Sequence, residues 1–260
     1  MIVDNELLRR WYRRLTFPSR YDAAFESLLG EAETAVNEAF GDDAAANILT
    51  ALYRCERLLA QYREHGIDEA VLDATLRDIV IWTDTWYTLS GEFGVMEIHW
   101  LDLHLSFKLF RLGRLQFCAG KATHAIPEAG VAEGDDILEV HIPADGSMGF
   151  EDCQASIAEA RRFYAQFFPA YRYKAFTCHS WLLDRTLRQF LGEESNIIKF
   201  QSLFTIAHDD VADDALKYIF RWDAKREQVA SFEAKSKLAA AVKQHALNGG
   251  TFYCSLGWFL

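Results

Sequence analysis

The fold is decided by residues 135–168, which read DDILEVHIPADGSMGFEDCQASIAEARRFYAQFF. The run Ile137–Pro143 is typical of a buried strand, Ala144–Gly149 is a turn with two glycines, and Phe150–Phe168 has the apolar spacing of an amphipathic helix. A strand that passes through glycines into a helix N-terminus directs several backbone N–H groups at one point, where a phosphate can bind. The stretch therefore predicts an anion site, although a G-x-x-G turn more often simply connects two elements.

The strand in this stretch has two chemically different faces. Leu138, Val140 and Ile142 alternate with Glu139 and His141, so a carboxylate and an imidazole share the face opposite the apolar side chains. One interpretation is an ordinary solvated sheet face. The other is a proton-accepting pair beside the predicted anion site.

The helix that follows begins with two carboxylates. Gly149 is the expected N-cap, and Glu151 and Asp152 fall in the first turn, where negative charge suits the helix dipole. The same two charges would repel a phosphate at that position.

The rest of the second half also alternates strands with helices. Leu115–Ala119 has the two-residue period of a strand and should pair antiparallel with Ile137–Pro143, because their connection needs no crossover. Further strands are expected at Tyr173–Trp181, Leu203–Ala207, Leu216–Trp222 and Thr251–Leu260, with an acidic turn at His208–Asp214. Helices are expected at Asp184–Leu191, Ser195–Phe204 and Phe232–Leu247. This order predicts a mixed sheet of about six strands with helices on its faces.

The first half has a helical period instead. Apolar side chains recur three or four positions apart within Asn5–Leu15, Tyr21–Phe40, Ile48–Tyr62, Asp68–Trp86 and Gly94–Phe110. The period changes near Gly113, and that change alone marks a boundary. The sequence thus predicts an α+β protein in which a helical N-terminal domain, residues 1–112, packs on a mixed-sheet domain, residues 113–260.

Composition narrows the possible partners and the compartment. The net charge is −11 and no run of lysines or arginines forms a stripe, which argues against nucleic acid. No N-terminal apolar region and no long uninterrupted apolar segment is present, so we expect neither secretion nor membrane spanning, and a cytoplasmic protein. The five cysteines are never in C-x-x-C spacing and should be reduced, buried thiols. His99 and His104 are five apart, which is not the spacing of a helical metal pair, and no metal site is expected.

Four motifs carry a resemblance to a known family: Arg111-Leu-Gly-Arg-Leu-Gln-Phe117, Val140-His-Ile-Pro143, Phe176-Thr-Cys-His-Ser-Trp-Leu-Leu183 and Ser195-Asn-Ile197. With the order of elements, they resemble bacterial acyltransferase-domain proteins that join a helical N-terminal domain to a GNAT-like (N-acetyltransferase-like) C-terminal domain. The resemblance covers nearly the whole chain.

This resemblance implies an acyl-CoA co-substrate, acetyl-CoA or another acyl-CoA, in the V between two splayed central strands. Its pyrophosphate would lie on the loop between the strand and helix described first, which assigns binding to Ile142, Ala144, Gly146, Ser147, Met148 and Gly149. Asn196 would contact the pantetheine arm, unless Ser195 and Asn196 merely cap a helix. The loop departs from the superfamily pattern because its first side-chain donor and its middle glycine are missing.

The implied activity is transfer of the acyl group to an amine of a small molecule or peptide by direct attack on the thioester. Such an enzyme needs a base for the ammonium and an acid for the departing thiolate. Glu139 or His141 is the candidate base and Tyr218 the candidate acid. A covalent route through Cys178 is weaker, because its neighbour His179 points to the opposite face of the strand. The alternative is a non-catalytic protein that binds acyl-CoA or another small ligand on a degenerate GNAT fold, which the missing loop donor favours.

Overall fold

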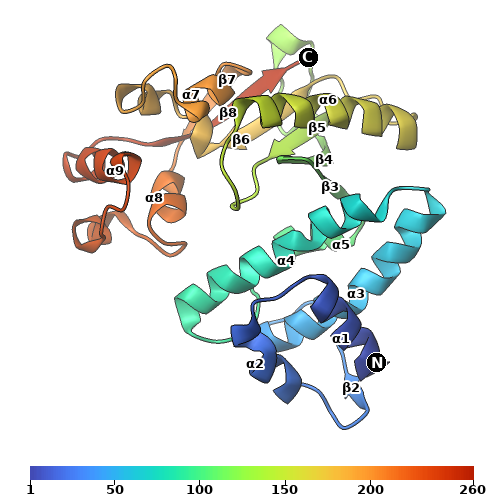
Figure 1. The fold of residues 1–260 in the computed structure, drawn as a ribbon. Helices are drawn as coiled ribbons and strands as arrows, with labels where there is room; N and C mark the ends of the chain where they lie inside the picture. Colours follow the sequence, from blue (N-terminus) through green and yellow to red (C-terminus); the bar gives the residue numbers. More distant parts are fainter. The chain divides into compact units, whose positions relative to one another are not determined.

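The computed structural model describes all residues from 1 to 260 and divides them into two compact units, Met1–Leu112 and Gly113–Leu260 (Figure 1). The first unit is mainly helical, and the second contains a mixed sheet flanked by helices. The α+β fold class predicted from the sequence is therefore confirmed. None of the helices combines the length and the apolar composition that crossing a bilayer requires.

The first unit is built around a long helical hairpin. It consists of α3 (Ala44–Glu64) and α4 (Glu69–Ser90), whose N-termini are capped by the carboxylates of Asp43 and Asp68. Gly91 ends α4 in the left-handed conformation that glycine adopts without strain. The other elements are β1 (Ile2–Asp4), α1 (Asn5–Arg14), α2 (Asp22–Ser27), β2 (Glu33–Ala35), α5 (Ile98–Leu105) and β3 (Leu109–Leu112).

Two helices predicted in this unit are shorter than expected. The segment Tyr21–Phe40 is helical only as far as Ser27, and β2 then pairs with β1. The buried Asn5 explains the break, because it donates a hydrogen bond to the Gly30 carbonyl and accepts one from the Thr34 hydroxyl. These hydrogen bonds join residues that are far apart in the sequence, and they outweigh the local helical period of the apolar side chains. The segment Gly94–Phe110 is likewise helical only at Ile98–Leu105.

The second unit has five strands in the order β4-β5-β6-β8-β7. They are β4 (Leu115–Lys121), β5 (Asp136–His141), β6 (Phe176–Ser180), β7 (Thr205–Val211) and β8 (Tyr253–Phe259). The pairs β4–β5, β6–β8 and β7–β8 are antiparallel, and β5–β6 is parallel. The antiparallel pairing predicted for the first two of these strands is confirmed. The helices are α6 (Phe150–Phe167), α7 (Asn196–Gln201), α8 (Asp214–Ile219) and α9 (Lys237–Leu247), with 3₁₀ turns at Trp181–Leu183, Arg185–Gln189 and Arg226–Ser231.

One predicted strand in this unit is wrong, and one turn is mostly a strand. The residues Leu216–Trp222 do not form a strand, because α8 runs to Ile219. Its apolar side chains recur with helical spacing, and Ala215 and Leu216 are buried in a cluster with Val242 and Phe252. The predicted acidic turn His208–Asp214 belongs largely to β7, which pairs along its length with β8.

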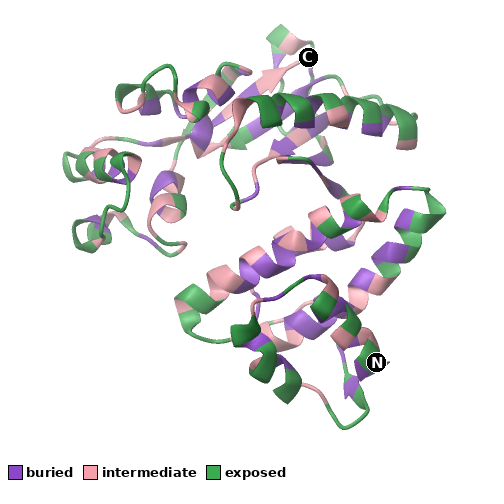
Figure 2. Ribbon diagram, in the orientation of Figure 1, coloured by how far each residue is buried: buried purple, intermediate pink, exposed green.

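Helix α6 covers one face of the sheet. Its inward residues, including Cys153, Ala160 and Phe163, are buried, whereas its outer side is exposed (Figure 2). The Tyr164 hydroxyl donates a hydrogen bond to the Phe117 carbonyl on β4, and the Arg161 guanidinium lies 4.8 Å from the ring centroid of Phe176 on β6. The opposite face of the sheet carries the side chains considered next.

Candidate active site

The two central strands of the second unit diverge. Parallel β5 and β6 are in register only at Leu138 with Phe176 and at Glu139 with Thr177. Beyond this point each strand stays paired with its outer neighbour, β5 with β4 through His141 and β6 with β8 through Ser180. The two strands therefore part after Glu139 and Thr177, beside His141 and His179.

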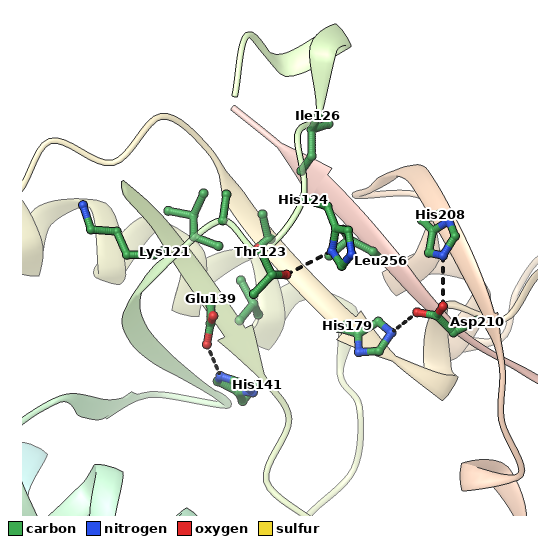
Figure 3. Close-up of a pocket in the computed structure, with 14 residues that line it drawn as sticks. Lys121, Thr123, His124, Ile126, Glu139, His141, His179, His208, Asp210 and Leu256 are labelled. Carbon is green, nitrogen blue, oxygen red and sulfur yellow. Dashed lines mark hydrogen bonds and ion pairs between the residues drawn. The ribbon is translucent and has the colours of Figure 1, made fainter. Parts of the chain in front are cut away.

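A pocket of about 240 Å³ lies on the sheet face opposite α6 (Figure 3). Its floor is apolar and includes Ile126, Ile137 and Leu256, two of which belong to a buried cluster. Its rim is polar and includes four of the eight histidines of the chain, His124, His141, His179 and His208. An apolar floor with a few convergent polar groups is typical of a small-molecule site.

Glu139 and His141 are together on this face, as their alternation on the strand predicts. The Glu139 Oε2 atom lies 3.4 Å from Nε2 of His141, and both side chains are about one-third exposed or less, at 36% and 28%. Glu139 also lies against Gly120 on β4, where a Cβ atom would come within 2.7 Å of its carboxylate oxygen. Glycine at this position therefore makes room for the carboxylate beside the imidazole. A carboxylate next to one ring nitrogen favours a proton there and leaves the other nitrogen to accept one.

A second carboxylate and two imidazoles complete the rim, and the sequence analysis did not group them. The Asp210 carboxylate accepts hydrogen bonds from Nε2 of His208 at 2.9 Å and Nε2 of His179 at 3.1 Å. The hydrogen bond from His208 is the main cause that lowers the pKa of Asp210 below its usual value. No alternation of apolar and polar residues marks this segment as a strand, so the sequence alone does not bring His208 and Asp210 together with His179.

The loop assigned to the pyrophosphate joins β5 to the N-terminus of α6. Ile142, Ala144, Gly146, Ser147, Met148 and Gly149 all lie in it, and Gly149 is the N-cap of α6. Gly146 has a φ of 73°, a left-handed conformation that favours glycine. The Arg114 guanidinium donates hydrogen bonds to the Ser147 carbonyl at 2.8 Å and to the Pro143 carbonyl at 3.1 Å. A positive charge thus sits beside a loop whose own side chains supply none.

A carboxylate lies at the same helix N-terminus. A Cβ atom added to Gly149 would meet the Asp152 Oδ2 atom at 2.2 Å, so Asp152 folds back against the N-cap. Its charge interacts favourably with the helix dipole and competes with any anion for the free N–H groups of the first turn.

The remaining predicted site residues lie elsewhere in the second unit. Asn196 is the first residue of α7 and is exposed, and the N-cap Ser195 makes no side-chain capping hydrogen bond. Tyr218 lies on α8 and is 49% exposed, with its ring stacked 6.1 Å from Trp181. It does not line the pocket with Glu139 and His141, so the strand placement that motivated its role as the acid is wrong.

Cys178 is enclosed on the side of β6 that faces away from the pocket. Its side chain is 2% exposed, and burial raises the pKa of its thiol far above the ordinary value. Only a thiolate is an effective nucleophile, and a raised pKa leaves almost none at neutral pH. The covalent route through this cysteine therefore has no support in the structure.

The variant Cys178→Ser is accordingly expected to keep wild-type activity within about twofold, because a thiol that stays protonated cannot carry the acyl group. Steady-state rates of thiol release from an acyl-CoA measure this, with a melting curve as control for packing. A loss of activity of a hundredfold with an unchanged melting temperature would restore the covalent route.

The described residues form no group of three histidine, cysteine, aspartate or glutamate side chains that could hold a metal ion. Two imidazole–carboxylate groups line the pocket: His141 with Glu139, and His179 and His208 with Asp210.

Comparison with protein families gives two matches. The model of a GNAT-like C-terminal domain matches residues 109–259, and the model of an N-acyltransferase N-terminal domain matches residues 4–107. No protein of curated function matches the sequence.

Several solved structures are similar to this chain over most of its length. One, an acyltransferase in complex with decanoyl-CoA, is 27% identical, has a TM-score of 0.73, and is matched over 97% of this chain and 76% of its own. A second, with decanoyl-CoA and teicoplanin, is 22% identical with a TM-score of 0.78, over 96% of this chain and 86% of its own. A third, with CoA and 10C-teicoplanin, is 24% identical with a TM-score of 0.71, over 82% of this chain. The chain spans 65% of the length of that third protein.

Proposed function

Because the chain belongs to the family that joins an N-acyltransferase N-terminal domain to a GNAT-like C-terminal domain, we propose that it is an acyl-CoA-dependent N-acyltransferase. The acyl group would pass directly from the thioester to an amine. The observation that carries this proposal is the divergence of β5 from β6 directly beside the Glu139–His141 pair.

The chain's own residues supply the groups that this chemistry needs. Backbone N–H groups on the open ends of β5 and β6 would hold the pantetheine arm and the thioester oxygen, on which negative charge develops. His141, oriented by Glu139, would take the proton that an ammonium must lose before its nitrogen can attack. The first turn of α6 and the nearby Arg114 would face the pyrophosphate.

The acyl donor is proposed by analogy with the similar structures. They hold decanoyl-CoA or CoA, which supports an acyl-CoA and favours a medium chain over acetyl-CoA. One of them also contains teicoplanin and another contains 10C-teicoplanin, which supports an amine acceptor of small-molecule or peptide type.

Calorimetric titration with acetyl-CoA, octanoyl-CoA and decanoyl-CoA tests the proposal at its first step. We expect saturable binding that is strongest for the longer chains, followed by thiol release when primary amines such as teicoplanin, a diamine or a dipeptide are added. The absence of binding for all three thioesters would reject the proposed function.

The second candidate is a protein that binds acyl-CoA without reacting it. One observation favours it, namely the Asp152 carboxylate at the helix N-terminus where the pyrophosphate should lie. Tight binding without amine-dependent thiol release across the panel would favour this candidate over the enzyme.

The position of the pyrophosphate is tested by Asp152→Asn. Removal of a negative charge a few ångströms from the phosphates should tighten CoA binding about fivefold, because like charges repel there. Calorimetry with CoA measures the change. The matched control is Glu159→Gln, which removes one charge two turns further along α6 and should leave the affinity unchanged. Equal effects of the two variants would place the pyrophosphate away from this helix end.

A further inference from the structure

Two histidines occupy equivalent positions on the diverging strands. Glu139 on β5 is the partner of Thr177 on β6, and His141 and His179 each follow two positions later. Residues two apart on a strand share a face, so both imidazoles lie on the pocket side of the sheet. Both line the pocket, one on each arm of the opening between β5 and β6 (Figure 3).

Each of these imidazoles has a carboxylate behind it. His141 has Glu139 at 3.4 Å, and His179 donates from Nε2 to Asp210 at 3.1 Å. Asp210 is held in turn by strand β7, where the neighbouring Asp209 accepts a hydrogen bond from the Ser255 hydroxyl of β8 at 2.6 Å. The arrangement thus contains two imidazole–carboxylate pairs that face one opening.

The other titratable and charged groups of the pocket near His179 have partners of their own. His208 shares the same carboxylate, and the His124 ring stacks on that of His208 at 6.3 Å. The lysine of the pocket, Lys121, is paired with Asp136 at 2.7 Å. The Asp210 carboxylate, whose pKa is lowered chiefly by the hydrogen bond from His208, also lies within hydrogen-bond distance of His179.

We propose that His179 is the general acid that protonates the departing thiolate, with Asp210 as the residue that positions it. This inference rests on the proposed acyltransferase function. It gives the acid role to a group on the arm of the opening that faces His141, whereas Tyr218 lies on α8 and does not line this pocket.

His141 takes one proton from the ammonium, the nitrogen bonds to the thioester carbon, and the carbon–sulfur bond breaks with its electron pair on sulfur. The imidazolium of His179 gives its Nδ1 proton to that sulfur, because its Nε2 proton is engaged by Asp210. The new amide nitrogen gives its surplus proton to the neutral His179, and His141 releases its proton to water. Free thiol, amide and one proton result.

A nucleophile that is uncharged at neutral pH allows the role of the general acid to be measured separately from the role of the general base. Hydroxylamine is largely uncharged at neutral pH and needs no base, whereas the thiolate of decanoyl-CoA still needs an acid. Thiol release above the uncatalysed background is therefore measured with decanoyl-CoA and hydroxylamine in wild type, His179→Gln and Asp210→Asn. The control is His65→Gln, which changes an exposed histidine at the end of α3 in the other unit.

We expect His65→Gln to match wild type with this nucleophile, and His179→Gln to be about a hundredfold slower. Wild-type activity should fall at alkaline pH as the imidazolium loses its proton, and that fall should be absent in His179→Gln. Asp210→Asn should also be slower than wild type, because His179 loses the charged acceptor that holds it. A purely structural role for His179 would not change the pH profile.

The failures of the two proposals are distinguishable. If wild type binds decanoyl-CoA and releases thiol, but His179→Gln keeps both the rate and the alkaline fall, the acid role is rejected and the transferase stands. If wild type releases no thiol, both are rejected. Calorimetry with CoA guards against misfolding, and equal affinity in His179→Gln is expected because the side chain is 51% exposed.

Discussion

Replacement of His141 by alanine is expected to slow acyl transfer to an alkylamine about a hundredfold. An alkylamine is almost fully protonated at neutral pH, so its nitrogen has no lone pair for attack until a base removes the proton. The His141 imidazole lies beside the opening between β5 and β6 and is oriented by Glu139. No other imidazole on β5 can replace it.

The measurement is the rate of thiol release from decanoyl-CoA with a saturating primary amine from the panel described above. Glu139→Gln should cost less than His141→Ala, because the imidazole remains and loses only its charged neighbour. Both variants should bind decanoyl-CoA as wild type does, since neither side chain is assigned to the co-substrate.

Two outcomes would contradict the base role. One is a wild-type rate in His141→Ala with the alkylamine, which would mean that the amine loses its proton to water unaided. The other is a loss of the same size with hydroxylamine, which needs no base, and this would point to damage of the pocket instead. In the first case the Glu139–His141 face would be an ordinary solvated sheet face.

The stretch 135–168 could be predicted from the sequence because its information is local. The two-residue period of β5 and the helical period of α6 are both complete within the segment, and Gly149 marks the boundary. The face shared by Glu139 and His141 follows from the same alternation, which needs no knowledge of the partner strands.

The second half of the site could not be predicted in this way. His208 and Asp210 lie on β7, an edge strand whose side chains are mostly exposed, so no alternation of apolar and polar residues marks it as a strand. Three consecutive polar residues resemble a turn in the sequence, and only pairing with β8 extends them. The grouping of His179 with Asp210 depends on that pairing, because it brings together residues 31 positions apart.

The error at Tyr218 has a related cause. The run Leu216–Trp222 contains aromatic residues that favour strands, but its buried positions fall on one side of a helix and pack in a cluster with α9. A short apolar run fits the helical period and the strand period equally well, and here tertiary packing favours the helix.

Asp184→Ala is expected to destabilise the second unit by about 3 kcal/mol. The side chain is 1% exposed, and its two oxygens accept backbone hydrogen bonds from Thr186 at 2.8 Å and from Tyr253, the first residue of β8, at 2.9 Å. Hydrogen bonds to a charged group contribute about 1.5–3 kcal/mol each, and alanine would leave both N–H groups without their acceptor. The loss should release β8 from the 3₁₀ turns that follow β6.

Hydrogen exchange localises this effect. Peptides from β8 should lose protection in Asp184→Ala, whereas peptides from α3 and α4 in the other unit should exchange as in wild type. Asp184→Asn keeps one acceptor oxygen and should lose about half as much stability, and Glu233→Ala, which removes an exposed carboxylate from the same unit, should change it by less than about 0.5 kcal/mol. Unchanged protection of β8 in Asp184→Ala would mean that β8 is held by its pairing with β6 and β7 alone. The Asp184 carboxylate would then contribute nothing to the strand that anchors Asp210 beside His179.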